Sequence, residues 1–216
     1  MIKNILKFGT WNLQGGIQEN KSLEVLKNDL NYYGVDCCCF QETHCKDNEK
    51  IFKNGCKIIC FGGKNETAAK RYGQGFFVSK KLVGNIVNYQ YISDRICYIK
   101  FRMNNIDSLV PKYQTIVNVY VPTSSITKKD PNITNQFYNL LENTLVGLKS
   151  RHNTIMMGGD FNGKIGHKLE NEKFLGMYGR GDRNINGDLL VEFCNGEKKF
   201  FISNTKFNVK MCHRST

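Results

Sequence analysis

Short apolar runs of strand type alternate with amphipathic helical segments along most of this 216-residue chain. Strand patterns occur at residues 5–11, 35–41, 57–63, 73–80, 96–103, 114–122, 154–160 and 199–205, and helical periodicity at residues 21–34, 135–151 and 186–194. This order of elements predicts a layered α/β sandwich. Because the chain shows no repeat, no low-complexity linker and no clear boundary, we expect a single domain over residues 1–216.

Three of these elements have specific expected features. The run at 154–160 predicts a buried strand, and Asn186 is expected as the N-cap of the helix at 186–194. In the helix at 135–151, an apolar stripe is expected to form one face, consisting of Phe137, Leu140, Leu141, Leu145 and Leu148.

The formal net charge is +12. Such an excess of Lys and Arg favours a polyanionic partner, with nucleic acid the first candidate and an anionic membrane surface the second. AT-rich coding would also enrich Lys and Asn whatever the function, so charge alone leaves the partner open. The N-terminus lacks a signal-peptide pattern and no apolar run reaches spanning length, so we expect an intracellular protein, nuclear or cytoplasmic, that is neither secreted nor in a membrane.

The nine cysteines lack the spacing of a zinc finger or a disulfide framework. Cys37, Cys38 and Cys39 lie in an apolar run, where adjacent side chains alternate between faces and do not converge on one metal. Cys56 and Cys60 have no second pair at ligand spacing. We therefore expect buried apolar cysteines in a reducing compartment.

Polar side chains end three of the strand-type runs. Asn12 follows the first run, Glu42 another, and Asp160 with Asn162 a third, in the segment GGDFNGKIG. Ligands gather where the strands of open α/β sheets end, so these side chains can converge although they are distant in sequence. Strand alternation would place Asp160 and Asn162 on one side, with Phe161 turned into the core. Individually, Asn12 could be a turn former, Glu42 a solvated charge, and Asp160 with Asn162 a cap or Asx-turn.

Such a set suits metal-assisted attack of water on a phosphodiester. Glu42 can supply an oxygen ligand to Mg²⁺, which commonly keeps several waters and takes further oxygens from the substrate phosphate. Asp160 could hold or deprotonate the attacking water, and Asn162 could donate a hydrogen bond to the charge developing at phosphorus.

Four segments resemble, in order and approximate spacing, the signature segments of the endonuclease/exonuclease/phosphatase superfamily: TWNLQGG, CFQETHC, NVYVPTS and MGGDFNGKIG. The later segments YGRGDRNINGDLLVEFC and ISNTKF are similar to the apurinic-type endonuclease domain of non-LTR retrotransposons, in particular RTE-type elements and craniofacial development protein 2-like sequences. The resemblance covers essentially the whole chain and implies a two-sheet α/β sandwich.

The resemblance also implies roles for individual residues. Glu42 matches the principal metal ligand of the family, for Mg²⁺ or alternatively Mn²⁺, and Asn12 matches the neighbouring carboxamide. Tyr120 matches the tyrosine that contacts the scissile phosphate. Asp160 matches the residue that orients or activates the water, and Asn162 the one that hydrogen-bonds the phosphate.

Arg183 and Asn184 fall in a segment that the resemblance places near the DNA backbone. A loop charge and a turn former are the alternatives for these two residues.

The sequence departs from the family at its end. The Trp-containing segment, the further Asp and the closing Ser-Asp-His triplet of the family have no match, and the residues SDR at 93–95 lie in the wrong place for that triplet. The histidines at 44, 152, 167 and 213 match no catalytic position, and we expect each at the surface or in a loop. We therefore expect a sandwich that lacks its last strands and is incomplete at the C-terminus.

The resemblance implies a Mg²⁺-dependent DNA endonuclease, a hydrolase derived from a retrotransposon. Its expected partners are DNA and a reverse transcriptase domain of the parent element, and we expect a monomer. Two alternatives stay open: a catalytically inactive, truncated relic that retains nucleic-acid binding, and a phosphatase of the same superfamily that acts on small phosphoesters.

Overall fold

The computed structural model describes residues 6–15, 20–62, 73–103, 110, 112–196 and 200–208. The chain is divided into two compact units, which we call the first unit (residues 1–120 and 140–160) and the second unit (residues 121–139 and 161–216). Whether the two units together behave as the expected single domain stays a prediction.

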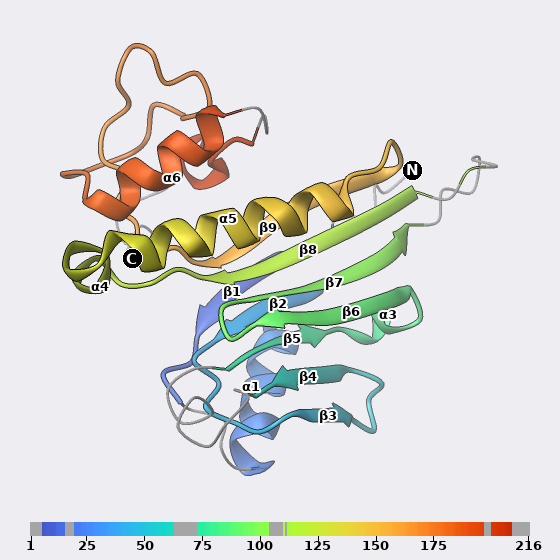
Figure 1. Ribbon diagram of the computed structural model, residues 1–216. Coiled ribbons are helices and arrows are strands. Elements are labelled where there is room, and N and C mark those ends of the chain that lie inside the picture. Colours follow the sequence, from blue (N-terminus) through green and yellow to red (C-terminus); the bar gives the residue numbers. More distant parts are fainter. Residues whose placement is uncertain are drawn as a thin grey trace. The chain divides into compact units, whose positions relative to one another are not determined.

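The first unit contains two β-sheets (Figure 1). The first sheet has the strand order β1-β2-β5-β4-β3, with β1 at Phe8–Asn12, β2 at Cys37–Gln41, β3 at Asn48–Ile51, β4 at Lys57–Phe61 and β5 at Gln74–Val78. β1 and β2 are parallel, and the other neighbours are antiparallel. The sheet is therefore mixed, and its one parallel pair brings the ends of β1 and β2 to the same edge.

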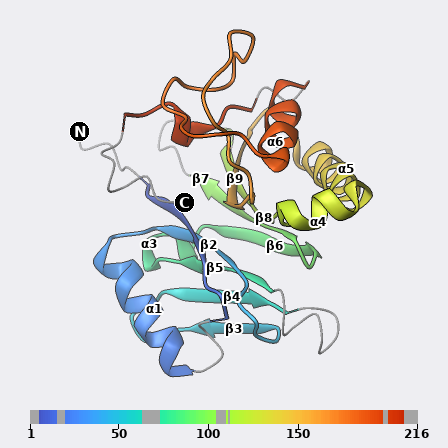
Figure 2. The same cartoon turned by 90° about the vertical axis from the view of Figure 1, so that its left-hand side faces the viewer.

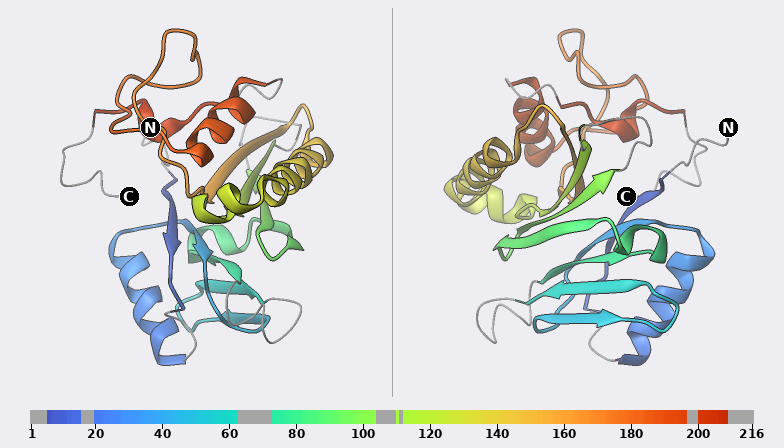
Figure 3. Two further views of the ribbon diagram at one scale, coloured as in Figure 1. Left: turned by 60° about the vertical axis from the view of Figure 1, so that its left-hand side comes forward. Right: turned by 90° about the vertical axis from the view of Figure 1, so that its right-hand side faces the viewer.

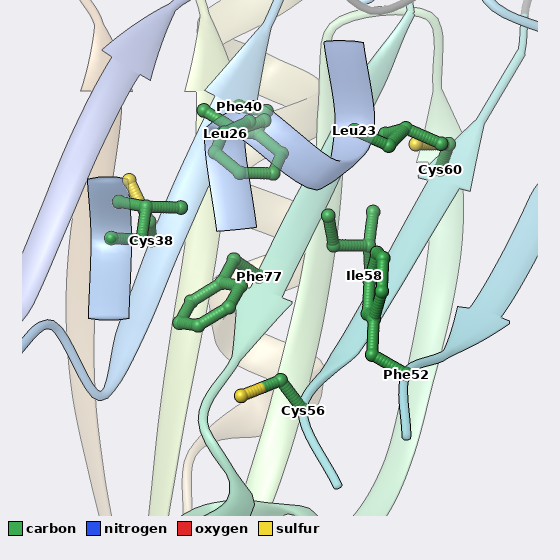
Figure 4. Close-up of a cluster of buried hydrophobic side chains, with 10 residues drawn as sticks. Leu23, Leu26, Cys38, Phe40, Phe52, Cys56, Ile58, Cys60 and Phe77 are labelled. Atoms are coloured by element: carbon green, nitrogen blue, oxygen red, sulfur yellow. The ribbon is translucent and has the colours of Figure 1, made fainter. Parts of the chain in front are cut away.

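Helix α1 (Asn20–Tyr32) covers one face of the first sheet (Figure 2). Its buried residues Leu23, Leu26 and Leu30 are spaced three and four apart, so they share one side of the helix. They pack in one cluster with side chains of the sheet that include Phe40 and Phe77 (Figure 4). The helix predicted at residues 21–34 is thus confirmed, and it ends before Gly34, whose φ is 64°.

The second sheet has the order β6-β7-β8-β9, with β6 at Ile86–Ser93, β7 at Ile96–Met103, β8 at Lys112–Tyr120 and β9 at Asn153–Asp160. β6, β7 and β8 are antiparallel, whereas β9 is parallel to β8. A parallel neighbour requires a crossover connection, which here contains α4 (Ser124–Lys129) and α5 (Pro131–Leu148). The short helix α3 (Lys80–Val83) connects β5 to β6.

The two sheets of the first unit pack face to face (Figure 3). Cys37, Cys39 and Phe76 of the first sheet share a buried cluster with Ile99 and Ile116 of the second. Alternation along β2 sends Cys38 to the other face, toward α1. The predicted two-sheet α/β sandwich is therefore confirmed.

The cysteines of the described residues are free thiols. Seven of them are buried, as expected, and Cys45 is only partly buried. Burial raises the pKa of the Cys37 and Cys39 thiols well above the usual value, so both are neutral apolar groups in the core.

Two expectations, one for β9 and one for α5, need correction. The strand β9 is not buried, because it is the edge of the second sheet, and Met156 is 40% exposed. In the apolar stripe of α5, Phe137, Leu141 and Leu145 are buried, but Leu140 is 38% exposed. Leu148 is partly buried.

The second unit contains α4, the first half of α5, helix α6 (Ile185–Asn195) and the 3-10 turn η1 (Ser203–Thr205). The N-cap of α6 is Asn184, not Asn186: its side chain accepts a hydrogen bond from the backbone N–H of Gly187. Asn186 is fully buried inside the helix, where its Nδ2 donates to the carbonyl oxygen of Pro122 at 2.7 Å.

The strand predicted at 199–205 is absent from the described residues 200–205. Ile202 makes a single bridge to Leu175, and the chain then turns into η1. The hydroxyl of Thr205 donates to the carbonyl oxygen of Ile202, which favours the turn over an extended strand. Among the described helices, none is both long and apolar enough to cross a lipid bilayer.

Candidate active site

Asn12 and Glu42 meet at the edge where β1 and β2 end. The parallel register places Asn12 opposite Gln41, the residue before Glu42. Nδ2 of Asn12 donates to Oε1 of Glu42 at 2.8 Å. The convergence expected from the two strand ends is therefore present in the structure.

Glu42 has a left-handed backbone with φ of 51°, which is unusual for a residue other than glycine. Two backbone hydrogen bonds hold this bend: the N–H of Leu13 donates to the carbonyl of Gln41 at 2.9 Å, and the N–H of Gly15 donates to the carbonyl of Glu42 at 2.7 Å. A strained backbone maintained by its surroundings is frequent at functional sites. The bend ends β2 and fixes the position from which the Glu42 side chain extends.

Tyr120 and Asp160 bring the second sheet to the same place. They are the last residues of β8 and β9, and the parallel register pairs them directly. The phenol of Tyr120 donates to Oε1 of Glu42 at 2.7 Å, and Nδ2 of Asn12 donates to Oδ2 of Asp160 at 3.1 Å. Four strand ends from two sheets thus contribute one hydrogen-bonded cluster, in which the Asn12 amide joins the carboxylates of Glu42 and Asp160.

Glycine is required where β9 approaches this cluster. Gly159 has a φ of 151°, and a Cβ atom built on it would lie 2.0 Å from the carbonyl oxygen of Val119 on β8. No side chain fits there without separating the two strands. The glycine before Asp160 therefore permits the close pairing that places Asp160 beside Tyr120.

The phenol of Tyr120 is a neutral donor. Burial raises its pKa above the usual range, and the hydrogen bond to Glu42 raises it further. The residue is 8% exposed. Glu42 therefore receives a hydrogen from a group that remains protonated at neutral pH.

Arg95 is a member of the cluster's surroundings that the sequence did not indicate. Its guanidinium carbon lies 5.0 Å from the centre of the Tyr120 ring, and Nη1 donates to the Tyr120 carbonyl at 3.1 Å. The N–H of Tyr120 in turn donates to the Arg95 carbonyl at 2.9 Å. A positive charge is thus held directly beside Tyr120, the hydrogen-bond partner of Glu42.

The donor set fits a hard divalent cation. The cluster offers oxygen donors from Glu42 and Asp160, and within the described part of the chain Oε2 of Glu42 accepts no hydrogen bond. No group of three or more His, Cys, Asp or Glu side chains gathers among the described residues. A cation here would keep several waters or take phosphate oxygens, as Mg²⁺ commonly does and as a closed zinc site does not.

Asn162 lies in the second unit, outside the strand. β9 ends at Asp160 and Asn162 has a φ of 47°, so the alternation expected to align the two side chains does not extend to it. Its Nδ2 donates to the carbonyl of Val121 at 2.8 Å. Its own carbonyl accepts from Nδ2 of Asn184 at 3.1 Å, so these two predicted site residues are neighbours.

Arg183 and Asn184 both have structural partners in the second unit. The Arg183 guanidinium binds both carboxylate oxygens of Glu172, and the two side chains are 14% and 8% exposed. Oδ1 of Asn184 accepts from the N–H groups of Lys164 and Gly187, at 2.9 and 2.8 Å. Arg183 is therefore held in an ion pair and Asn184 caps α6, while their expected place near the DNA backbone stays a prediction.

The histidines lie mostly where the sequence places them. His152 and His167 are exposed, and His213 is outside the described residues. His44 follows Glu42 in a loop, but it is only partly exposed, and its Nε2 is buried without a hydrogen-bond partner among the described residues. A Cβ on Gly15 would lie 2.6 Å from Nδ1 of His44, so this ring packs tightly against the loop after β1.

Residues 9–167 match the model of the Endonuclease/Exonuclease/phosphatase family. Among solved structures, the human Nocturnin catalytic domain with bound sulfate anion is 16% identical, with a TM-score of 0.42, over 70% of this chain and 62% of that chain. The chain thus spans less than two thirds of that domain, and so distant a likeness carries no functional argument. No curated protein matches the sequence.

Proposed function

The chain belongs to the Endonuclease/Exonuclease/phosphatase family, and from this premise we propose that it is a divalent-metal-dependent phosphodiesterase that nicks DNA. Members of the family are hydrolases and generally use divalent metals. The observation on which the proposal depends is the convergence of Asn12, Glu42, Tyr120 and Asp160 at four strand ends. This cluster joins two carboxylates, an amide and a neutral phenol, which can hold a divalent cation, accept a proton from water and donate hydrogen bonds to developing charge.

Each residue has a proposed role in this reaction. Glu42 would hold Mg²⁺, or Mn²⁺, which when bound polarises a phosphate oxygen and offsets its developing charge. Asp160 accepts the proton of the attacking water, because its carboxylate is oriented by Asn12. Tyr120 orients the Glu42 carboxylate. The role of Asn162 as a hydrogen-bond donor to the phosphate is implied by the family resemblance and stays a proposal.

DNA is the proposed substrate because of the net charge of +12. Segments similar to RTE-type elements support a retrotransposon origin, with a reverse transcriptase domain in the parent element. We also propose a nuclear or cytoplasmic site of action and a monomeric state. We propose that Arg183 and Asn184 act on DNA binding indirectly. They stabilise the loop that would face the DNA and do not contact the DNA themselves.

Plasmid relaxation tests the proposal. We expect purified protein to convert supercoiled plasmid to the nicked form in Mg²⁺ or Mn²⁺ and not in EDTA. Glu42→Gln and Asp160→Asn should each lower the rate by roughly 100-fold or more, a typical loss for a group that stabilises the transition state. Asp29→Asn, an exposed carboxylate of α1, is the matched control and should nick at the wild-type rate.

Two results would contradict the proposal. Folded protein that releases phosphate from inositol phosphates but leaves plasmid intact would point to a small-phosphoester phosphatase. Folded protein without activity on either substrate would point to an inactive relic. Duplex binding should also weaken steeply as the salt concentration rises from about 50 to about 200 mM. A protein that makes about 6–10 phosphate contacts loses roughly 10³–10⁵ in affinity over that range.

A further inference from the structure

Three buried amide side chains lie next to the candidate active site in the space between the two sheets; we call Gln41, Gln74 and Asn118 the amide layer. Each is at most 1% exposed. Along β2 the side chains that face the second sheet are Cys37, Cys39 and then Gln41. The side chains between the two sheets therefore change from apolar groups to amides just before the strands end.

Hydrogen bonds of the amide layer join the two sheets. Nε2 of Gln41 donates to Oδ1 of Asn118 at 2.7 Å, which connects β2 to β8. Nδ2 of Asn118 returns to the first sheet and donates to the carbonyl oxygens of Phe40 at 2.8 Å and Gly75 at 3.1 Å. Asn118 is thus bonded to both β2 and β5 from the opposite sheet.

The third amide supports the neighbourhood of Tyr120. Nε2 of Gln74 donates to the carbonyl oxygen of Arg95 at 2.9 Å, and the same carbonyl accepts from the N–H of Tyr120 at 2.9 Å. Arg95 is the residue whose guanidinium packs on the Tyr120 ring. Gln74 therefore connects β5 of the first sheet to the turn that holds Tyr120.

The hydroxyl of an exposed residue, Thr10, anchors the layer to β1. Oγ1 of Thr10 on β1 donates to Oε1 of Gln41 at 3.1 Å. Two backbone carbonyl oxygens of the first sheet, which can only accept, hold Nδ2 of Asn118, so Oδ1 of Asn118 faces Gln41. Gln41 therefore presents its Nε2 to Asn118 and its Oε1 to Thr10. Thr10 itself is exposed, so its hydroxyl can be removed without opening the core.

Three members of the network lie within two residues of a site residue in the sequence. Thr10 is two residues before Asn12 on β1, and Asn118 is two residues before Tyr120 on β8, so each pair shares one side of its strand. Gln41 directly precedes Glu42. Apolar contacts deeper in the sandwich are non-directional, whereas these hydrogen bonds fix both distance and orientation between the sheets.

We propose that the amide layer, anchored to β1 by Thr10, is a positioning device that holds Tyr120 of the second sheet against Glu42 of the first. Its residues are positioning residues, since they touch neither substrate nor metal. The effect that we expect on the nicking rate rests on the proposed function. The effect that we expect on metal affinity at Glu42 rests on the geometry alone.

The test compares substitutions of one exposed threonine with one of a buried amide. Thr10→Val keeps the shape and removes the hydroxyl, and Thr10→Ser restores it. Gln41→Met keeps the length and removes both hydrogen bonds of the side chain. Thr154→Val on β9 is the matched control, because Thr154 is also an exposed strand residue.

Two properties are measured on each folded variant: kcat and KM for plasmid nicking, and Mg²⁺ affinity. The second uses the fluorescence of Trp11, the only tryptophan, which lies between Thr10 and Asn12 and is 43% exposed. For Thr10→Val we expect kcat to fall roughly 10-fold with KM unchanged, and for Gln41→Met up to about 100-fold, the loss associated with a shift of about 1 Å. Mg²⁺ affinity should fall in both, while Thr10→Ser and Thr154→Val should match the wild type.

The outcomes separate this inference from the proposed function. Wild-type rate and wild-type Mg²⁺ affinity in folded Thr10→Val would overturn the positioning role, even if Gln41→Met failed to fold. If the wild type binds Mg²⁺ but does not nick DNA, the proposed function fails and Mg²⁺ affinity decides the inference alone: a loss in Thr10→Val and recovery in Thr10→Ser would support it. If the wild type does not bind Mg²⁺, both fail.

Discussion

The Tyr120 phenol donates a 2.7 Å hydrogen bond to the carboxylate of Glu42, and the two residues belong to different sheets of the first unit. Glu42 also accepts from Asn12, which is on its own sheet. One carboxylate oxygen is therefore fixed from two directions. This arrangement orients Glu42 before any cation binds. The side chain therefore loses less conformational entropy when a cation binds.

Tyr120→Phe removes the hydroxyl that orients Glu42 and keeps the aromatic ring that packs beside Arg95. The ring remains beside Arg95, but the hydrogen bond to Glu42 is lost. We expect the nicking rate to fall roughly 10- to 100-fold, equivalent to the 1.5–3 kcal/mol of a hydrogen bond to a charged group. Single-turnover nicking at saturating Mg²⁺ measures the rate of the variant relative to the wild type. A wild-type rate would show that Tyr120 does not orient Glu42.

The same phenol predicts a dependence of stability on alkaline pH. Since burial and Glu42 raise the pKa of Tyr120 above its unfolded value of about 10, its contribution to stability is fully present below about pH 10 and is lost as pH rises toward the folded value. In metal-free protein, the difference in free energy of unfolding between wild type and Tyr120→Phe should be constant from pH 7 to 9 and should shrink above about pH 10. Urea unfolding at each pH measures this difference, and a gap that widened above pH 10 would contradict it.

Asn12→Ala should make the protein depend on a cation for stability. The Asn12 amide donates to both Glu42 and Asp160, so its loss leaves two neighbouring carboxylates without a shared donor. Without metal we expect the free energy of unfolding to fall by about 1–3 kcal/mol. Mg²⁺ should restore most of it, because a cation that binds only the folded state stabilises by about 2.7 kcal/mol at 100 times its dissociation constant.

Thermal unfolding in EDTA and in Mg²⁺ measures the effect. Asn88→Ala, at an exposed position of β6, is the matched control and should show the Mg²⁺ response of the wild type. An equal Mg²⁺ response in Asn12→Ala and wild type would mean that Asn12 does not bridge the two carboxylates.

The central strands β2 and β5 of the first sheet were predictable because they are buried on both faces. β2 and β5 are continuous apolar runs, and the polar residue that ends such a run is conspicuous, as at Glu42. The strands β3 and β6, which the sequence did not indicate, are sheet edges with polar, exposed residues. Local patterns are weakest where one face of a strand meets water.

The candidate site was predictable in part for the same reason. Asn12, Glu42 and Asp160 end strands, and Tyr120 was indicated by the family resemblance. Arg95 was not, since its contact with Tyr120 depends on the pairing of β7 with β8 and leaves no local signal.

The cap of α6 shows a different limit of sequence reasoning. Asn184 and Asn186 are both good capping residues two positions apart. Only the tertiary bond of Asn186 to Pro122, and the extended backbone of Asn184, decide between them.

Arg183→Met should destabilise the second unit. It removes the guanidinium from Glu172, which is 8% exposed, and from the carbonyl oxygen of Ile165. We expect a loss of roughly 1.5–3 kcal/mol at neutral pH. The hydrogen bond from Arg183 lowers the pKa of Glu172, so this stabilisation is present above the unfolded glutamate value of about 4.3 and is lost as pH falls through the folded value.

The difference in free energy of unfolding between wild type and Arg183→Met should therefore disappear below about pH 4. Chemical unfolding at a series of pH values from 7 to 3 measures this difference. Arg180→Met, at an exposed position in the same segment, should have wild-type stability. Unchanged stability with weaker DNA binding in Arg183→Met would instead support direct contact of Arg183 with the DNA backbone.

Gly159→Ala should disrupt the pairing that places Asp160 beside Tyr120. The new Cβ would lie 2.0 Å from the Val119 carbonyl oxygen, and the φ of 151° is itself unfavourable for alanine. The end of β9 must then move away from β8, and Asp160 moves with it. Since a displacement of about 1 Å can cost roughly 100-fold in rate, we expect a loss of that order in plasmid nicking together with a lower unfolding temperature. Gly147→Ala is the matched control: no atom lies within 4 Å of its added Cβ, and alanine in α5 should stabilise the helix by up to about 1 kcal/mol. If folded Gly159→Ala nicked DNA at the wild-type rate, the close pairing of β8 with β9 would not be what positions Asp160.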